Sequence, residues 1–321
     1  MKVAVLSGGR SSEHDVSLLS GAAVARGLRE SGHDVVEVTI SRDGRWSYAG
    51  SSVELVAGEG LLGADAVFPA LHGPFGEDGS VQGLLEQLDV PYVGSDVLSS
   101  SICMDKLTLK RLFAAQGIPQ VDFAAVGEPD WWERCQALGL PLWVKPSRLG
   151  SSVGITRVDE LGQLDEAVEL ALRHDPRAIV EASASGREVE CSVLGNREPL
   201  ASPPGEVLSH RDWYDFESKY TEGGMELRVP APISAAEIGR VQELAVDVFQ
   251  LAGCSGLARC DFFVEPDGTV LVNEINTMPG FTDMSVYAKL FEAGGLPYAE
   301  LCDRLVALAI ERHHEARSYE F

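Results

Sequence analysis

The chain of 321 residues has no long apolar run, no paired cysteines and few lysines. No stretch approaches the roughly 20 apolar residues that a membrane-spanning helix needs, which argues against an integral membrane protein. The first apolar run covers only residues 3–6, whereas a secretory signal needs roughly 7–15 apolar residues. We therefore expect no signal peptide and a cytoplasmic location.

The six cysteines form no Cys-x-x-Cys pair, and their spacings are irregular. This pattern favours free thiols that are buried as small apolar residues over a disulfide framework or a metal site. Because 45% of the residues are hydrophobic, a chain of this length can bury a sizeable core and needs neither disulfides nor a structural metal.

Positive charge is also scarce, because 26 Lys and Arg residues stand against 49 Asp and Glu residues, a formal net charge of −23. Such a chain repels nucleic-acid phosphates and anionic membranes, so neither is expected as a partner. Only six of the cations are lysines, so a lysine in an unusual setting merits attention. They are Lys2, Lys106, Lys110, Lys145, Lys219 and Lys289.

The N-terminal part alternates strand-like and helix-like segments. Strands are expected at residues 3–6, 34–40 and 64–71, and helices at about 16–30 and 80–88. This alternation is typical of a parallel sheet covered by helices. Glycine-rich segments follow the first and third strands, at the edge where such sheets bind ligands.

From about residue 95 the pattern changes, and the length allows roughly two domains or three small ones. A helix is expected at 104–116, and the prolines and paired glycines of residues 203–232 predict a long loop. The remaining expected strands cover residues 142–145, 154–157, 178–181 and 188–194, and the remaining expected helices cover 161–173 and 235–252.

Two apolar runs on either side of a Pro-Asp-Gly sequence predict a β-hairpin over residues 257–276. A turn centred on the Pro-Asp pair would place Arg259 opposite Glu274 and Asp261 opposite Val272. Side chains alternate between the two faces of a strand.

One face of this hairpin would then carry Arg259, Asp261, Val272, Glu274 and Asn276. Carboxylate and amide oxygens without His or Cys suit a hard cation, Mg²⁺ or Mn²⁺. The alternative is a sheet surface with a salt bridge between Arg259 and Glu274. The irregular Thr-Met-Pro-Gly sequence directly after Asn276 favours a ligand site, because a plain sheet surface does not need it.

A second pattern begins at Lys145, which closes an apolar strand and precedes a Gly- and Ser-rich loop ending at Gly154. Backbone N–H groups in such a loop can bind phosphate oxygens, with the lysine as a point charge, and a plain hairpin turn is the alternative. Lys106 follows Asp105 at the start of a helix, where Asp105 is alternatively only a helix cap. Lys219 lies in the long polar segment, where a solvated lysine is the alternative.

Together these motifs resemble the D-alanine–D-alanine ligases, a family of the ATP-grasp superfamily. The resemblance covers about residues 3–309 and depends on six segments in this order. They are residues 8–17, 71–79, 104–106, 145–154, Lys219-Tyr220 and 273–280.

The resemblance implies a fold of mixed α/β and α+β class. A Rossmann-like (preATP-grasp) substrate domain at residues 1–95 would precede a two-lobed ATP-grasp fold. Its central lobe would cover residues 96–182, and its C-terminal lobe, with the metal and catalytic residues, 183–321. The family also suggests a homodimer.

The same resemblance implies ATP and two Mg²⁺ (or Mn²⁺) ions as cofactors. The residues that match nucleotide contacts are Lys106, Lys145 and Lys219 for phosphates, Ser151 in the cover loop, and Glu181 and Glu188 for adenine and ribose. Those that match metal ligands are Asp261, Glu274 and Asn276. Residues 182–184 are Ala-Ser-Ala, smaller than in many relatives, although backbone contacts to adenine need no particular side chain.

The implied reaction joins two D-alanine molecules through a D-alanyl phosphate, for peptidoglycan precursor synthesis. Glu13 would hold the ammonium group of the first D-alanine, and Ser285 lies in the region that receives the carboxylate of the second. Arg259 and the N–H of Gly280 would stabilise the oxyanion of the tetrahedral intermediate. The resemblance also implies that Tyr220 hydrogen-bonds with Ser151, and that Ser151 in turn reaches Glu13.

Three alternatives remain at this point. One is a related ATP-grasp ligase that makes D-Ala-D-Ser or D-Ala-D-lactate. Another is a homologue that binds nucleotide without turnover, which the retained Asp261 and Glu274 disfavour. The third is a nicotinamide oxidoreductase, which the absence of a G-x-G-x-x-G sequence disfavours.

Overall fold

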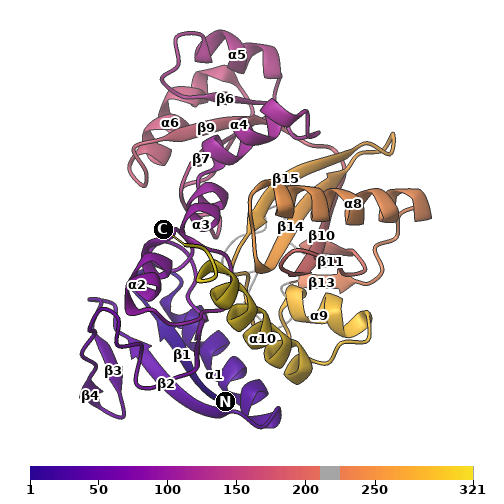
Figure 1. The fold of residues 1–321 in the computed structure, drawn as a ribbon. Helices are drawn as coiled ribbons and strands as arrows, with labels where there is room; N and C mark the ends of the chain where they lie inside the picture. The colour runs from indigo at the N-terminus through magenta and orange to yellow at the C-terminus, as the bar shows by residue number, and fades with distance from the viewer. Residues whose placement is uncertain (210–224, 321) are drawn as a thin grey trace.

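Three separate β-sheets dominate the computed structural model, which describes residues 1–209 and 225–320 (Figure 1). The sheets follow one another along the chain. The second sheet and its helices lie at the top of Figure 1, the first at the lower left and the third at the right. No helix within the described ranges is long and apolar enough to cross a membrane.

The first sheet has the strand order β4-β3-β2-β1-β5. Its strands are β1 (Lys2–Gly8), β2 (Asp34–Ile40), β3 (Trp46–Tyr48), β4 (Ser51–Ser52) and β5 (Ala66–Pro69). Strand β1 pairs in parallel with β2 and β5, as the alternating pattern predicts. Strands β3 and β4 add an antiparallel edge that the sequence analysis did not anticipate. Helices α1 (His14–Glu30) and α2 (Ser80–Leu88) follow β1 and β5.

One hydrophobic core joins the first sheet to the end of the chain. Helix α1 packs beside α10 (Tyr298–Ala316), and both lie against apolar side chains of β1 and β5. Phe68 contacts Phe281 with ring centroids 5.3 Å apart, and Phe281 contacts Tyr287 of α9 (Val286–Ala293) at 5.4 Å. The segment after β15 is thereby held against strand β5 and helix α9.

The second sheet is antiparallel, with the order β6-β9-β7-β8. Its strands are β6 (Phe123–Ala125), β7 (Leu142–Pro146), β8 (Thr156–Val158) and β9 (Ala178–Ala182). Helices α5 (Trp131–Leu138) and α6 (Leu164–Leu172), the latter after the 3-10 turn η1 (Leu161–Gln163), bury one face. The strand expected at residues 154–157 is displaced, and β8 begins two residues later, after Gly154 adopts a left-handed φ of 72°.

The helix expected at residues 104–116 is present as α4 (Lys106–Gln116), which begins two residues later than expected. A helix that was not expected, α3 (Val97–Met104), precedes it, and the two helices meet at Asp105. Asp105 is extended, with φ −90° and ψ 96°, and its side chain accepts a hydrogen bond from the Thr108 N–H. The cap at Asp105 is therefore present at the start of α4, and it separates α4 from α3.

The third sheet has the order β13-β12-β10-β14-β15, with β11 beside β10. Its strands are β10 (Arg187–Gly195), β11 (Leu200–Ala201), β12 (Gly205–Ser209), β13 (Met225–Arg228), β14 (Gly256–Val264) and β15 (Val270–Asn276). The long loop expected over residues 203–232 is therefore wrong at both ends. Val207 and Leu227 pack beside Leu290, and this burial gives β12 and β13 an apolar side despite the nearby prolines and glycines.

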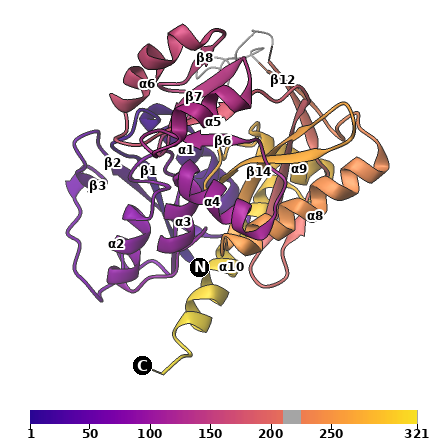
Figure 2. The ribbon, with the colours of Figure 1, turned by 90° about the horizontal axis from the view of Figure 1, so that it is seen from above.

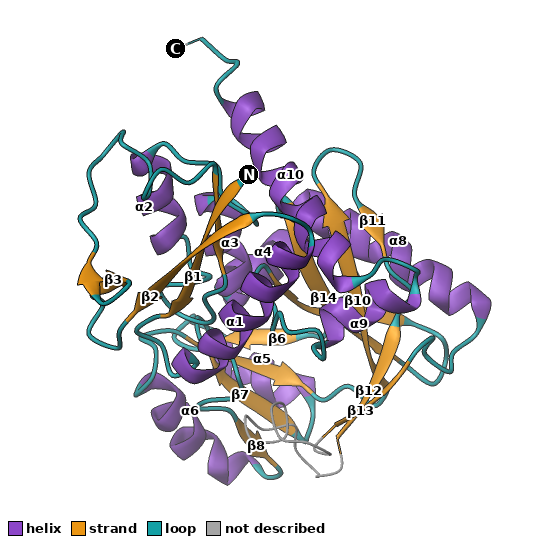
Figure 3. Ribbon diagram, turned by 90° about the horizontal axis from the view of Figure 1, so that it is seen from below, coloured by secondary structure: helices purple, strands orange, loops and turns teal. Residues whose placement is uncertain are grey.

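The two faces of the third sheet differ in chemistry. One face packs its apolar side chains against α8 (Ala235–Leu251), and α8 and α9 both lie against this sheet in Figures 2 and 3. On the other face, Leu194 and Leu257 join the core near α9 and α10. Farther along the same strands this face carries Glu190, Arg259 and Asp261 instead. The change from apolar to charged residues marks where the sheet lines a cavity.

Candidate functional site

Two adjoining cavities occupy the junction of the sheets. The small cavity, of about 80 Å³, lies between the loops after β1 and β5, the start of the Gly- and Ser-rich loop, and the end of β15. The large cavity, of about 250 Å³, lies between the second and third sheets. The two cavities adjoin because both are lined by Lys106, Gly150, Ser151, Arg259 and Glu274.

Most of the residues predicted from the sequence line these cavities. The small cavity contains Glu13, Lys106, Ser151, Arg259, Glu274, Asn276 and Gly280. The large cavity contains Lys106, Lys145, Ser151, Glu181, Glu188, Arg259, Asp261 and Glu274.

Among the predicted residues that the structure describes, Ser285 does not line either cavity. Ser285 precedes α9, and its Oγ accepts a hydrogen bond from the Thr282 N–H at 2.9 Å and lies 2.9 Å from the Thr282 hydroxyl. Lys219 and Tyr220 lie outside the described residues.

The predicted hairpin of β14 and β15 is present, but its predicted register is wrong. The turn is longer than a two-residue loop, because Glu265 pairs with Thr269 and Gly268 adopts a left-handed φ of 87°. The pairing then shifts at a bulge between Asp261 and Phe262. Bulges of this kind re-aim side chains next to functional sites.

The bulge changes which residues share a face. Asp261 lies opposite Glu274, Arg259 opposite Asn276, and Val272 opposite Phe262. Val272 is fully buried in the core with α8, so its predicted place on the charged face is wrong. The other four residues do share the cavity face.

Arg259 is held tightly by neighbouring carboxylates. Its Nε donates to Asp261 Oδ1 at 2.7 Å, and its Nη2 donates to Asp261 Oδ2 at 2.8 Å. The Nε also lies 3.0 Å from Glu190 Oε2. Such a two-point contact fixes the guanidinium plane. Arg259 is thus paired with Asp261 and Glu190, on the same cavity face as Glu274.

The oxygen-rich side of the cavities fits a hard divalent cation. Asp261 and Glu274 are opposite neighbours, and the Asn276 amide donates to Asp261 Oδ2 at 3.0 Å. Lys106 Nζ lies 3.4 Å from Glu274 Oε2. Within residues 1–209 and 225–320 no group of three or more His, Cys, Asp or Glu side chains has metal-binding geometry. One or two carboxylates completed by substrate phosphates is the usual Mg²⁺ arrangement.

Lys145 reaches the large cavity from the second sheet. Its Nζ lies 2.5 Å from Glu181 Oε2. The other Glu181 oxygen lies 3.0 Å from the Nζ of Lys110, which projects from α4. Burial opposes ionisation of Glu181, but the charges of Lys110 and Lys145 outweigh it and lower the pKa of Glu181 to about 2. Each carboxylate oxygen of Glu181 is thus paired with a lysine. A contact of Glu181 with a ligand would therefore be made by its backbone.

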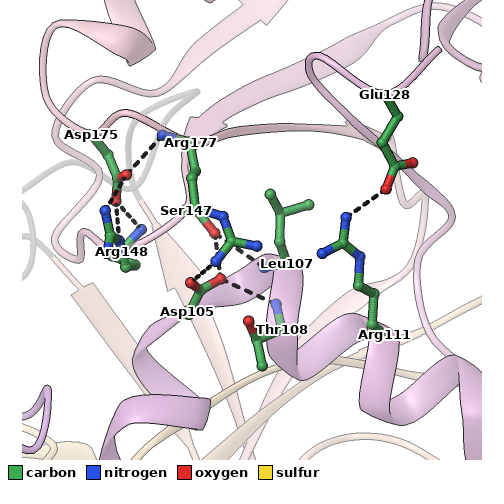
Figure 4. A network of polar contacts seen from close by, with 9 residues as sticks. All are labelled: Asp105, Leu107, Thr108, Arg111, Glu128, Ser147, Arg148, Asp175 and Arg177. Carbon is green, nitrogen blue, oxygen red and sulfur yellow. Dashed lines mark hydrogen bonds and ion pairs between the residues drawn. The ribbon is translucent and has the colours of Figure 1, made fainter. Parts of the chain in front are cut away.

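A polar network fixes the start of the Gly- and Ser-rich loop (Figure 4). The Ser147 hydroxyl donates to Asp105 at 2.8 Å and accepts the Leu107 N–H at 3.1 Å. Arg177 also donates to Asp105, and Asp175 accepts the Arg148 N–H at 2.8 Å. The network therefore ties the strand end that carries Lys145 to the helix start that carries Lys106.

Two carboxylates meet in the small cavity. Glu13 is 7% exposed, and Glu77 accepts the Gly73 N–H at 2.6 Å and the Met278 N–H at 3.4 Å. Burial and the nearby Glu13 raise the pKa of Glu77 to about 8, against the opposing effects of these N–H groups and of Arg259. A cavity with this carboxylate pair favours a positively charged ligand group.

His72 joins the two sides of the small cavity. It is buried, with its Nε2 2.8 Å from Ser20 Oγ and its Nδ1 2.9 Å from the Met278 carbonyl oxygen. Burial lowers its pKa. Both ring nitrogens are therefore engaged, and the side chain positions the loops.

Three site residues carry no expected role from the sequence: Glu77, Glu190 and Lys110. Glu77 lies within a segment that carries the family resemblance, so its position in that segment is a signal. The scarcity of lysine is the corresponding signal for Lys110. Glu190 follows Glu188 on β10, and its contact with Arg259 depends on strand pairing that no local pattern contains.

The sequence matches two family profiles. Residues 112–307 match "D-ala D-ala ligase C-terminus", and residues 2–61 and 52–95 match "D-ala D-ala ligase N-terminus". A protein of Deinococcus radiodurans called D-alanine--D-alanine ligase is 45% identical over 97% of this chain and 98% of its own length.

Two solved structures of ligases have a fold similar to that of this chain. The D-alanine-D-alanine ligase from Coxiella burnetii is 37% identical, with a TM-score of 0.90 over 99% of this chain and 96% of that one. The VanG D-Ala:D-Ser ligase from Enterococcus faecalis is 35% identical, with a TM-score of 0.86 over 96% of this chain and 99% of that one.

Proposed function

The chain belongs to the D-alanine–D-alanine ligase family and joins two D-alanine molecules at the expense of ATP, and we propose which of its residues serve each step. The single observation that carries this assignment is the adjoining pair of cavities, which share Lys106, Ser151, Arg259 and Glu274. A phosphoryl group can pass between two ligands only where their sites touch.

We propose that ATP occupies the large cavity. Lys106 and Lys145 face it from two different elements and would neutralise phosphate charge, together with Lys219 outside the described residues. Glu188 would bind the ribose, and the backbone at Glu181 would contact the adenine. Phosphoryl transfer depends on positioning and charge neutralisation more than on covalent help from the protein.

Two Mg²⁺ or Mn²⁺ ions would be held by Asp261, Glu274 and Asn276, where they would supply positive charge to the phosphate oxygens. Until nucleotide binds, Arg259 and Lys106 lie beside these carboxylates. Both cations line the two cavities, so they face the space proposed for the phosphate oxygens.

The small cavity would hold the first D-alanine, with its ammonium group at Glu13 and its carboxylate toward the large cavity. That carboxylate attacks the γ-phosphorus of ATP, and D-alanyl phosphate and ADP form. The amine of the second D-alanine then attacks the acyl carbon, and phosphate leaves. The guanidinium of Arg259 and the N–H of Gly280 would stabilise the oxyanion of that step.

Ser285 would receive the carboxylate of the second D-alanine, and this requires its hydroxyl to exchange Thr282 for substrate. Ser151 would link Tyr220 to Glu13. The backbone at Ser151 and Ser152 has left-handed φ values of 52° and 59°. Such values are rare for these residues and recur at ligand-binding loops.

We further propose the division into domains at residues 1–95, 96–182 and 183–321, because each range contains one of the three sheets. We also propose that the protein forms a homodimer and that it is located in the cytoplasm. Size-exclusion chromatography with light scattering tests the first, and cell fractionation the second.

Phosphate release from ATP, measured with each D-amino acid in turn, tests the assignment. We expect release with D-alanine to depend on Mg²⁺ or Mn²⁺ and to give one phosphate for each dipeptide formed. Phosphate release that D-serine supports better than D-alanine would favour the activity named for the VanG ligase. No release with any D-amino acid would favour a nucleotide-binding homologue.

A further inference from the structure

Lys110 is a fully buried ammonium group behind the nucleotide cavity. Its side chain is 1% exposed, and its Nζ donates to the Val121 carbonyl oxygen at 3.2 Å and lies 5.8 Å from the centre of the Phe123 ring. It is not among the residues that line either cavity. Burying a lysine in this way is costly unless an opposite charge accompanies it.

The accompanying charge is Glu181, which is 3% exposed. Glu181 lies on β9, next to β7, and its side chain is on the face of the sheet that packs against α4. Lys145 is on that same face, and its side chain is 15% exposed. The three groups therefore form a line from the interior to the cavity: Lys110, Glu181 and Lys145.

The charges in this line add to a net charge of +1. Burial lowers the pKa of Lys110, and Glu181 opposes that effect. Burial also disfavours the charged form of Lys145, but Glu181 outweighs it and raises the pKa of Lys145. Without Lys110, the carboxylate of Glu181 would neutralise Lys145 alone, and the line would present no net charge to the cavity.

We propose that Lys110 is a positioning residue for the nucleotide: it neutralises Glu181 from behind, so that the positive charge of Lys145 is available to a phosphate group of ATP. This inference depends on the phosphate role proposed above for Lys145. It explains why an acidic, lysine-poor chain keeps a lysine in its interior, where it touches no ligand.

A purely structural role for Lys110 makes a different prediction. If Lys110 only compensated a buried carboxylate, its removal would lower stability and disturb all substrates together. If it sets the charge at the phosphate site, its removal weakens nucleotide binding, and removing Glu181 as well restores that binding because the net charge returns to +1.

The test compares Lys110→Met, Glu181→Gln, the double variant and Lys145→Met in the full chain, with Lys2→Met as the matched control. Lys2 is a surface lysine whose Nζ donates to the Leu62 carbonyl oxygen at 2.6 Å. Isothermal titration calorimetry with MgADP gives the nucleotide Kd, and steady-state kinetics give the separate KM values for ATP and D-alanine. Circular dichroism verifies folding.

We expect Lys110→Met to raise the Kd of MgADP and the KM for ATP by about tenfold, the effect of one partly screened charge. The KM for D-alanine should change less than about twofold, within the usual variation between independent sites. The double variant should recover most of the lost affinity, and Lys2→Met should resemble the parent protein.

Equal MgADP affinity in Lys110→Met and the parent would overturn the inference, as would a double variant no tighter than Lys110→Met. If Lys110→Met does not fold, Glu181→Gln is compared with the double variant. Glu181→Gln keeps both lysines and should bind MgADP about tenfold more tightly than the double variant does. Equal MgADP affinity in these two variants would also overturn the inference. Unchanged affinity in Lys145→Met would instead refute the phosphate assignment itself.

Discussion

Arg259 and Asp261 form a two-point contact on one strand, with N–O distances of 2.7 and 2.8 Å. Residues two apart on a strand share a face, so this contact needs no long-range folding event beyond the strand itself. It holds the proposed oxyanion-stabilising group and a proposed metal ligand in one fixed geometry.

Replacement of Asp261 by Asn is expected to lower dipeptide formation by at least about 100-fold, because an amide cannot supply the anionic oxygen that a hard cation prefers. Glu274→Gln should behave similarly. The measurement is turnover against Mg²⁺ concentration, with circular dichroism to verify the fold. Near-parental turnover at moderate Mg²⁺ would show that the residue only forms an ion pair.

Arg259→Lys tests the geometry of the guanidinium group. A lysine keeps the charge but loses the planar pair of donors, so kcat should fall by roughly 100-fold. The KM for ATP should change much less, because Lys106 and Lys145 carry the proposed phosphate contacts. Equal changes in kcat and in the KM for ATP would argue that the role of Arg259 is not confined to the attack of the second D-alanine on D-alanyl phosphate.

Asp105→Ala tests the polar network that fixes the start of the Gly- and Ser-rich loop. The variant loses the helix cap at Thr108 and leaves Arg177 without its carboxylate partner, which should lower the free energy of unfolding by about 2 kcal/mol. Chemical denaturation measures this change. The KM for ATP should rise as well, because Lys106 is the next residue. A stability loss with unchanged KM would show that the network does not position Lys106.

Glu77 should make the stability of the ligand-free protein depend on pH. Its pKa is raised from 4.5 to about 8, by burial first and then by Glu13, against the opposing effects of the Gly73 and Met278 N–H groups and of Arg259. Between these values the folded chain keeps a proton that the unfolded chain has released. The free energy of unfolding should therefore fall as the pH rises through that window.

Glu77→Gln should flatten this pH dependence, since an amide does not titrate. Urea unfolding at several values between about pH 5 and about pH 8 measures the effect. The same slope in the variant and the parent would place the responsible group elsewhere.

The sequence predicted the parallel strands of the first sheet and their helices, but not the antiparallel edge formed by β3 and β4. Strand β2 and helix α2 have the expected bounds, since each combines a clear periodicity with a glycine or acidic boundary. Strands β12 and β13 were missed because their apolar side is visible only once Leu290 packs against it. That contact joins residues far apart in the chain.

The site could be predicted only in part for a related reason. Each motif residue was identifiable by type and spacing, but the register of β14 and β15 depends on a bulge beside Asp261 that no composition rule reveals. The interior pairing of Lys110 with Glu181 likewise depends on how α4 lies against the second sheet. Residue identity gave the chemistry of the site, and tertiary packing determined which groups face each other.

A competition between second substrates tests the central claim most directly. The protein is given ATP, Mg²⁺ and D-alanine with equal concentrations of D-serine and D-lactate at about pH 7, where the D-alanine amine is mostly protonated. The products are separated by chromatography. The account predicts D-alanyl-D-alanine as the main product, with one phosphate for each dipeptide. An excess of D-alanyl-D-serine or of D-alanyl-D-lactate, or ATP hydrolysis without either product, would contradict it.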